Sequence, residues 1–180
     1  MQFVPTKLFL TKGVGTHKHE LRSFEMALRD AGIHMCNLVN VSSILPPRCK
    51  IIPRKVGEQL IQPGQITFAV LARISTNEPH RLIAASIGVA VPASEDDYGY
   101  LSELHTYGMS DQTAGDLAED MAAAMLASTQ GLEFSEDADW DQKQEAFKIS
   151  GKIVKTTNVT QSAVCTSQWT TVIAAGIYIF

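Results

Sequence analysis

Cysteine is scarce in this sequence, and its cysteines follow no metal-binding or disulfide pattern. There are three, Cys36, Cys49 and Cys165, among 180 residues. An odd number without a CxxC pair predicts reduced thiols rather than a disulfide framework. A zinc site is not expected either, because His17 and His19 stand two residues apart and would not share a helix face.

An excess of basic residues is also lacking, and so are long apolar runs. Lysine and arginine number 15 against 19 acidic residues, giving a net charge of −4. Nucleic-acid-binding proteins usually present a basic face. No apolar run reaches the roughly 20 residues of a membrane span, and Leu8–Leu10 is far too short for a signal peptide. We therefore expect a soluble, cytoplasmic protein with neither a nucleic-acid nor a membrane partner.

What is present is the composition of an ordinary globular domain. Hydrophobic residues make up 45% of the chain and charged residues 19%. A chain of 180 residues can bury a sizeable core without disulfides or structural metals, and no linker interrupts it. We expect one domain over residues 1–180.

Hydrophobic periodicity predicts two helices, at residues 17–31 and 111–129. Ser110 is expected to cap the second helix, and Gly32 and Gly131 to follow the two helix ends. The residues expected to form the buried stripes are Leu21, Phe24, Leu28 and Ala31 in the first helix, and Leu117, Met121, Ala124 and Met125 in the second.

Alternating and β-branched segments predict strands between and around these helices. The predicted strands are 3–10, 35–41, 65–75, 82–91, 98–107, 146–156 and 169–180. Gly13 and Gly15 are expected to break the first strand, and residues 136–141 to form an exposed acidic loop. Two helices against many strands predict an α+β fold, a multilayer α/β/β/α sandwich of two strand-helix-strand-strand halves.

One segment carries chemical information beyond the fold. Residues 37–47 read Asn-Leu-Val-Asn-Val-Ser-Ser-Ile-Leu-Pro-Pro. This segment resembles the cleavage site of the pyruvoyl-dependent arginine decarboxylases. The resemblance continues in register through 24–28, 31–33, 84–92 and 99–103. Several motifs in order are far more specific than one short match.

The resemblance implies that the chain cuts itself between Ser42 and Ser43. The Ser43 hydroxyl would attack the Ser42 carbonyl, and elimination followed by hydrolysis would leave a pyruvoyl group on residue 43. The products would be a β chain, 1–42, and an α chain, 43–180. Asn37 matches the family residue that assists cleavage.

The resemblance also implies the reaction and the residues that perform it. The pyruvoyl group would form an imine with L-arginine, without metal or pyridoxal phosphate, and release CO2 and agmatine. Glu103 matches the family's proton donor, Glu25 the partner of the substrate guanidinium, and Leu28 a neighbour of its alkyl stem. A homo-oligomer is expected, a trimer or a pair of trimers, with active sites between subunits.

Other interpretations remain open on the residues alone. Glu25 stands where the resemblance implies aspartate, and its longer side chain leaves room for a different amino acid as substrate. The chain could instead be an unprocessed, non-enzymatic oligomeric homologue. Serine pairs are common in loops, and Glu25, Glu103 and Asn37 could be ordinary surface or backbone-pairing residues.

Overall fold

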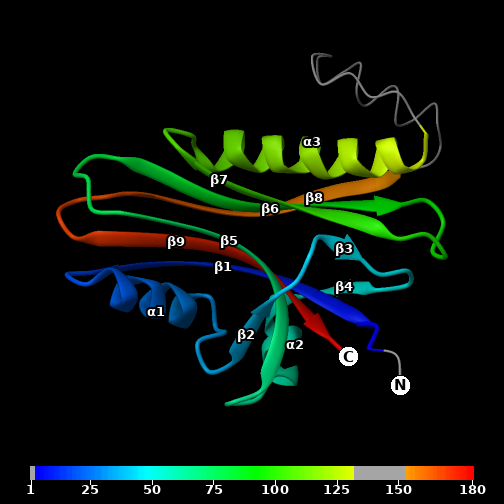
Figure 1. Ribbon diagram of the computed structural model, residues 1–180, viewed down its shortest axis with the longest axis horizontal. Coiled ribbons are helices and arrows are strands. Elements are labelled where there is room, and N and C mark those ends of the chain that lie inside the picture. The colour runs from blue at the N-terminus through cyan, green and yellow to red at the C-terminus, as the bar shows by residue number, and fades with distance from the viewer. Residues whose placement is uncertain (1–2, 132–152) are drawn as a thin grey trace.

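The computed structural model describes residues 3–131 and 153–180 of the chain (Figure 1). The acidic stretch 136–141 and most of the predicted strand 146–156 lie outside the described residues. Within them, strands and helices form two separate sheets and their covering helices, which confirms the predicted α+β class. No helix in this part of the chain is long and apolar enough to cross a bilayer.

The first sheet has five strands in the spatial order β2-β5-β9-β1-β4. They are β1 (Lys7–His17), β2 (Asn37–Asn40), β4 (Lys50–Ile52), β5 (Ile66–Thr76) and β9 (Trp169–Ile179). The last strand of the chain, β9, runs antiparallel to both β1 and β5. The first and last strands of the chain, β1 and β9, therefore pair with each other in the middle of this sheet.

The second sheet has four strands in the order β3-β7-β6-β8. They are β3 (Ile44–Leu45), β6 (Leu82–Pro92), β7 (Gly99–Tyr107) and β8 (Ile153–Val164). The two-residue strand β3 pairs with β7 at the edge of this sheet. The chain thus passes from the first sheet to the second between β2 and β3, over residues 41–43.

The sheets lie face to face, and each outer face carries a helix (Figure 1). The helical segments are α1 (Glu20–Asp30), α2 (Arg54–Gly57), the 3₁₀ turn η1 (Glu58–Leu60) and α3 (Asp111–Thr129). Helix α1 packs on β1 and β9, and α3 packs on β6, β7 and β8. The expected order strand-helix-strand-strand occurs twice, as β1-α1-β2-β3 and as β7-α3-β8-β9, with β4, α2, η1, β5 and β6 between the two units.

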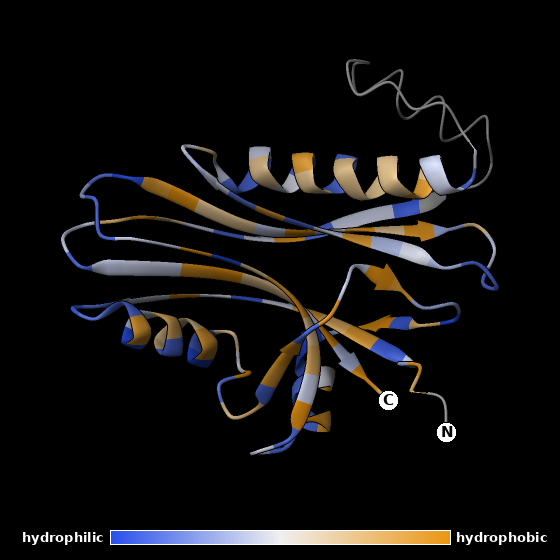
Figure 2. Cartoon of the chain, viewed as in Figure 1, coloured by the Kyte–Doolittle hydropathy of each residue, from blue (hydrophilic) through white to orange (hydrophobic). Residues whose placement is uncertain are grey.

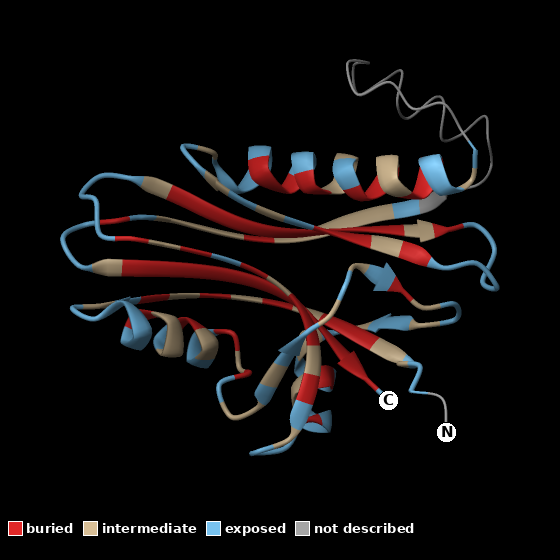
Figure 3. Ribbon diagram, in the orientation of Figure 1, coloured by how far each residue is buried: buried red, intermediate tan, exposed pale blue. Residues whose placement is uncertain are grey.

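The apolar core lies chiefly between the sheets, with a second cluster beneath α1. Figure 2 shows the orange, hydrophobic segments along the central strands, and Figure 3 shows the same strands buried. The inter-sheet cluster includes Leu8, Val70 and Ile87, whereas Phe9, Ile173 and Ile177 face α1. Successive side chains of β1 and β9 therefore point alternately into the two clusters, because side chains along a strand alternate between its two faces.

The expectation that Gly13 and Gly15 break the first strand is wrong. Strand β1 runs through both glycines to His17. A Cβ added at Gly13 would lie 2.2 Å from the Ala27 carbonyl oxygen, and one at Gly15 would lie 2.1 Å from the Ser23 carbonyl oxygen. These glycines are needed because the α1 backbone approaches the strand closely.

The predicted buried stripe of the second helix is also wrong in part. Leu117 and Met121 are each 38% exposed, while the buried face of α3 consists mostly of alanines. Similarly, Ser23 and Ala27 are the buried residues of α1, and Leu21 is 74% exposed. Small side chains face the sheets because the helices lie too close to accommodate large ones.

The predicted helix ends agree with the structure except at the start of the first helix, which was expected at residue 17; α1 begins at Glu20, and His17 still belongs to β1. The Ser110 hydroxyl accepts a hydrogen bond from the Thr113 N–H at the start of α3. Gly32 and Gly131 have φ angles of 74° and 69°, which suits glycine after a helix.

Candidate functional site

Ser42 and Ser43 lie where the chain enters the edge of the four-stranded sheet. Ile44 is in register with Tyr100 of β7, and the Leu101 N–H donates a 2.8 Å hydrogen bond to the Ser43 carbonyl oxygen. Pairing with β7 therefore fixes the position of residue 43 from its carboxyl side.

The backbone also turns tightly at Ser43. The Ile44 N–H donates a 3.0 Å hydrogen bond to the Ser42 carbonyl oxygen, which closes a three-residue turn with Ser43 at its centre. The carbonyl that Ser43 would attack is thus already bound to a backbone donor. Such a donor stabilises negative charge that develops on the oxygen.

Glu103 of β7 lies beside Ser43, as β3–β7 pairing brings the two strands together. Partial desolvation raises the pKa of Glu103, and the neighbouring Ser43 side chain and His105 only partly oppose this. The carboxyl therefore keeps its proton to a higher pH than an ordinary glutamic acid.

An open cavity of about 760 Å³ connects Glu103 to other predicted site residues. Its lining residues are Phe24, Leu28, Cys36, Asn37, Leu38, Asn40, Leu71, Arg73, Glu103 and His105. The Asn37 side-chain nitrogen donates a 3.0 Å hydrogen bond to the Gly64 carbonyl oxygen. The structure therefore brings Leu28, Asn37 and Glu103 around one cavity, and Ser43 lies beside Glu103.

Glu25 lies outside this group. It is on α1, one turn before Leu28, but it is not among the lining residues. Its carboxylate accepts a hydrogen bond from Arg29 and forms a 3.2 Å ion pair with Arg22. These contacts, that with Arg29 first, lower the pKa of Glu25, so this carboxylate is ionised and already paired with cations.

Comparison with known proteins shows the family to which the chain belongs. The family model for pyruvoyl-dependent arginine decarboxylase matches residues 7–180. The chain belongs to the pyruvoyl-dependent arginine decarboxylase family. The sequence resemblance is thereby confirmed over nearly the whole chain.

Relatives of similar length support this membership. The chain is 59% identical to the probable pyruvoyl-dependent arginine decarboxylase of Chloroherpeton thalassium and 58% identical to that of Chlorobium limicola, covering 98% of both chains in each case. It is 51% identical to pyruvoyl-dependent arginine decarboxylase 2 of Methanosarcina acetivorans, over 98% of this chain and 97% of that protein.

The surroundings of Ser43 fit the pyruvoyl group that the family name implies. Residue 43 has a backbone donor on its carbonyl from Leu101 and a partly desolvated acid, Glu103, at its side chain. Among the described residues, no group of three histidine, cysteine or acidic side chains is arranged to hold a metal ion.

Arg73 is a cavity residue that sequence reasoning missed. It lies on β5 with its guanidinium carbon 3.8 Å from the centre of the Phe24 ring, and it forms a 3.5 Å ion pair with Glu20. A single cation within the otherwise uncharged segment 65–75 was the available signal. Arg73 gives this cavity a cationic group beside the Glu103 carboxyl, and His105 adds an imidazole.

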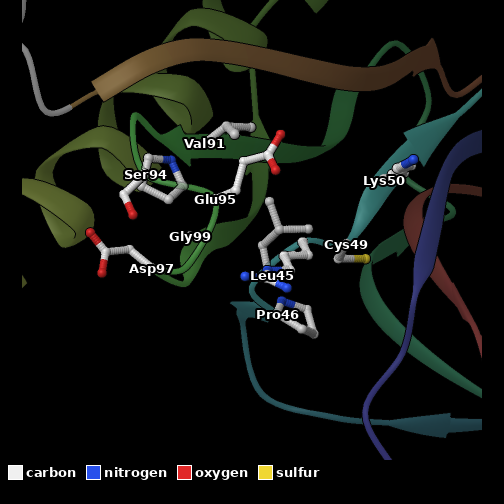
Figure 4. A pocket seen from close by; sticks show the side chains of 11 residues that line it. Leu45, Pro46, Cys49, Lys50, Val91, Ser94, Glu95, Asp97 and Gly99 are labelled. Carbon is white, nitrogen blue, oxygen red and sulfur yellow. The ribbon is translucent and has the colours of Figure 1, made fainter.

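Two smaller cavities flank the serine pair. One of about 280 Å³ touches Ser42 and is lined by Phe3, Pro5, Val41, Ser42, Ile44, Pro46, Phe68, Tyr178 and Phe180. Another of about 380 Å³ lies between the β3–β4 connection and the loop after β6, with Glu95, Asp97 and Cys49 around it (Figure 4). Burial raises the pKa of Cys49 to about 11. None of the predicted site residues lines this last cavity.

Proposed function

We propose that this chain cleaves itself between Ser42 and Ser43 and then converts L-arginine to agmatine and CO2. The observation that carries the proposal is the Glu103 carboxyl, which lies beside Ser43 and also lines the cavity shared by Asn37 and Leu28. The names of the relatives, all arginine decarboxylases, support the substrate and the reaction.

In the cleavage step, the Ser43 Oγ bonds to the Ser42 carbonyl carbon, and the amide becomes an ester. The Ile44 N–H stabilises the negative charge on the Ser42 oxygen, while the ionised form of Glu103 can accept the hydroxyl proton. Elimination at residue 43 then frees the Ser42 carboxylate, and water replaces ammonia to leave the pyruvoyl group. Asn37 assists this cleavage from the neighbouring cavity.

In the decarboxylation, the pyruvoyl group from Ser43 supplies the electron sink, without metal or pyridoxal phosphate. Glu103 holds the proton that replaces CO2 on the substrate, and its raised pKa suits a proton donor. Leu28 and Phe24 offer apolar surface to the alkyl stem of the substrate. The Leu101 N–H holds the carbonyl of residue 43 in place.

Glu25 is proposed to bind the substrate guanidinium from α1. Its position one turn from Leu28 supports this role, and its ionised state suits a cationic partner. An incoming guanidinium must share or displace Arg22 and Arg29. Because these arginines compete with a guanidinium for Glu25, a second candidate function is the decarboxylation of another amino acid by the same mechanism.

The proposal includes assembly and location. Exposed apolar side chains on both outer helices, including Leu21, Met26 and Met121, support a homo-oligomer, a trimer or a pair of trimers. The three cysteines are free thiols, which supports the cytoplasm as the compartment.

The test combines gel electrophoresis, intact mass and an assay of CO2 release. Processed protein should give chains 1–42 and 43–180, the larger lighter by one ammonia than the same chain beginning with serine. S43A should remain uncut, inactive and folded. If active wild-type protein runs as one full-length chain, the proposed cleavage is refuted. If arginine is not decarboxylated but another amino acid is, the proposed substrate is refuted.

A further inference from the structure

Tyr178 is a buried polar residue to which the proposed mechanism assigns no role. It lies on β9, is 3% exposed, and belongs to the inter-sheet cluster with Leu8, Leu45 and Val70. Its side chain therefore points from the five-stranded sheet toward the four-stranded sheet. Such an apolar site would accept phenylalanine equally well by shape and by hydrophobicity.

The Tyr178 hydroxyl reaches the segment that would be cut. It donates a 2.5 Å hydrogen bond to the carbonyl oxygen of Ile44, the residue that follows Ser43. Strand β3 has only two residues and lies at the edge of its sheet, so its own pairing with β7 fixes it weakly. The contact from β9 is a second attachment for Ile44, supplied by the opposite sheet.

Ile44 is in turn the residue whose N–H is bound to the Ser42 carbonyl oxygen. Fixing its carbonyl restricts the rotation of Ile44 and so keeps that N–H aimed at the Ser42 oxygen. Burial raises the pKa of Tyr178 well above its ordinary value. The hydroxyl therefore keeps its proton and remains a donor at any pH at which the protein works.

We propose that Tyr178 is a positioning residue for self-cleavage, holding Ile44 so that its N–H stabilises the Ser42 oxyanion. The inference rests on the proposed function. In the step concerned, the bond from Ser43 Oγ to the Ser42 carbonyl carbon forms, and the bond from that carbon to the Ser43 nitrogen breaks. The hydroxyl proton moves to the nitrogen, and the charge on the Ser42 oxygen is transient.

The first variant is Y178F, which removes only the hydroxyl. Freshly purified precursor should cleave on the order of 10-fold more slowly than wild type, because a donor at a developing oxyanion is worth up to ~10²–10³-fold and Tyr178 acts through Ile44. Once cleaved, its kcat per pyruvoyl group should equal that of wild type. Rates are compared at a temperature at which circular dichroism shows each protein folded.

The matched control is T11V. The Thr11 hydroxyl donates a 2.6 Å hydrogen bond to the Ala31 carbonyl oxygen, and the residue is 1% exposed, so this variant also loses one buried hydroxyl bond, far along the chain from the serine pair. It should cleave at the wild-type rate. Equal slowing of T11V and Y178F would show a general loss of stability and overturn the inference.

A second measurement identifies the step. Hydroxylamine cleaves esters, so it accelerates chain cleavage only where the ester accumulates. If Tyr178 acts on the attack, hydroxylamine should not restore the rate of Y178F; restoration would place the defect later and overturn the inference. If the wild-type chain cleaves and Y178F cleaves at the same rate, the inference is also overturned. If the wild-type chain never cleaves, the proposed function itself is refuted.

Discussion

The Glu103 carboxyl lies beside the Ser43 side chain at the edge of the four-stranded sheet. This contact links the residue proposed to become the prosthetic group with the one acid that lines the large cavity. A single carboxyl can thus take part in both reactions, accepting a proton in cleavage and donating one in decarboxylation. Its raised pKa favours the second task near neutral pH.

Replacing Glu103 by glutamine should separate the two reactions. Because general acid catalysis contributes about 10²–10⁴-fold, E103Q that has been cleaved should lose that factor in kcat, with little change in KM. Steady-state kinetics normalised to pyruvoyl content measure this. E95Q, which changes a carboxylate around a different cavity, should behave as wild type. A kcat of E103Q within twofold of wild type would remove Glu103 from the mechanism.

The pKa of Glu103 also predicts how stability changes with pH. Since its folded-state pKa is raised, the folded protein binds more protons than the unfolded chain between the ordinary value, about 4.3, and the raised one. Its contribution to the free energy of unfolding therefore falls as pH rises through that window. In E103Q the free energy of unfolding should not show this decrease. Urea titrations from about pH 4 to about pH 8 test it, and parallel curves for the two proteins would contradict it.

Glu25 should control the binding of arginine rather than the chemical step. If its carboxylate holds the guanidinium, E25Q should raise KM for arginine about 10–100-fold with kcat little changed, since a hydrogen bond to a charged group is worth ~1.5–3 kcal/mol. E58Q is the matched control, because Glu58 also accepts from an arginine four residues away, at 2.6 Å from Arg54. An unchanged KM in E25Q would assign guanidinium recognition to another group.

Gly88 should tolerate no side chain. A Cβ there would lie 2.1 Å from the carbonyl oxygen of Ala118, so G88A must push α3 away from the sheet. We expect a loss of about 1–3 kcal/mol in the free energy of unfolding, as for other overpacked cores. A93S, at an exposed position in the loop after β6, should change it by less than about 0.5 kcal/mol. Denaturant midpoints compare the two, and an equally small effect of G88A would contradict the close packing.

Much of the secondary structure could be predicted from local sequence signals. The predicted limits of the second helix, 111–129, are those of α3, because Ser110 and Gly131 mark its ends chemically. The long strands β5, β6, β7 and β9 agree with their predictions within one or two residues. On the helix faces, periodicity placed Phe24, Leu28 and Ala31 correctly toward the core. It was wrong for Leu21, Leu117 and Met121, since it scores large apolar residues as buried and the close approach of helix to sheet selects small ones.

The site was harder to predict because it depends on pairing between distant segments. The motif identified Ser43 and Glu103, but only the β3–β7 register places the two in contact. Tyr178 lies within a nearly continuous apolar run, where nothing in the sequence distinguishes a hydroxyl with a partner from ordinary core packing. The Arg22 and Arg29 contacts of Glu25 could be read from helical spacing, three and four residues away.

The position of β1 has a consequence for the processed protein. This strand lies between β9 and β4, and both neighbours belong to residues 43–180, whereas β1 itself belongs to residues 1–42. A chain cut after residue 42 becomes two polypeptides whose strands pair within one sheet and which are held together without a covalent bond. Refolding of the cut protein after denaturation then requires the two polypeptides to meet, a concentration-dependent step that the uncut S43A chain does not need before its subunits assemble.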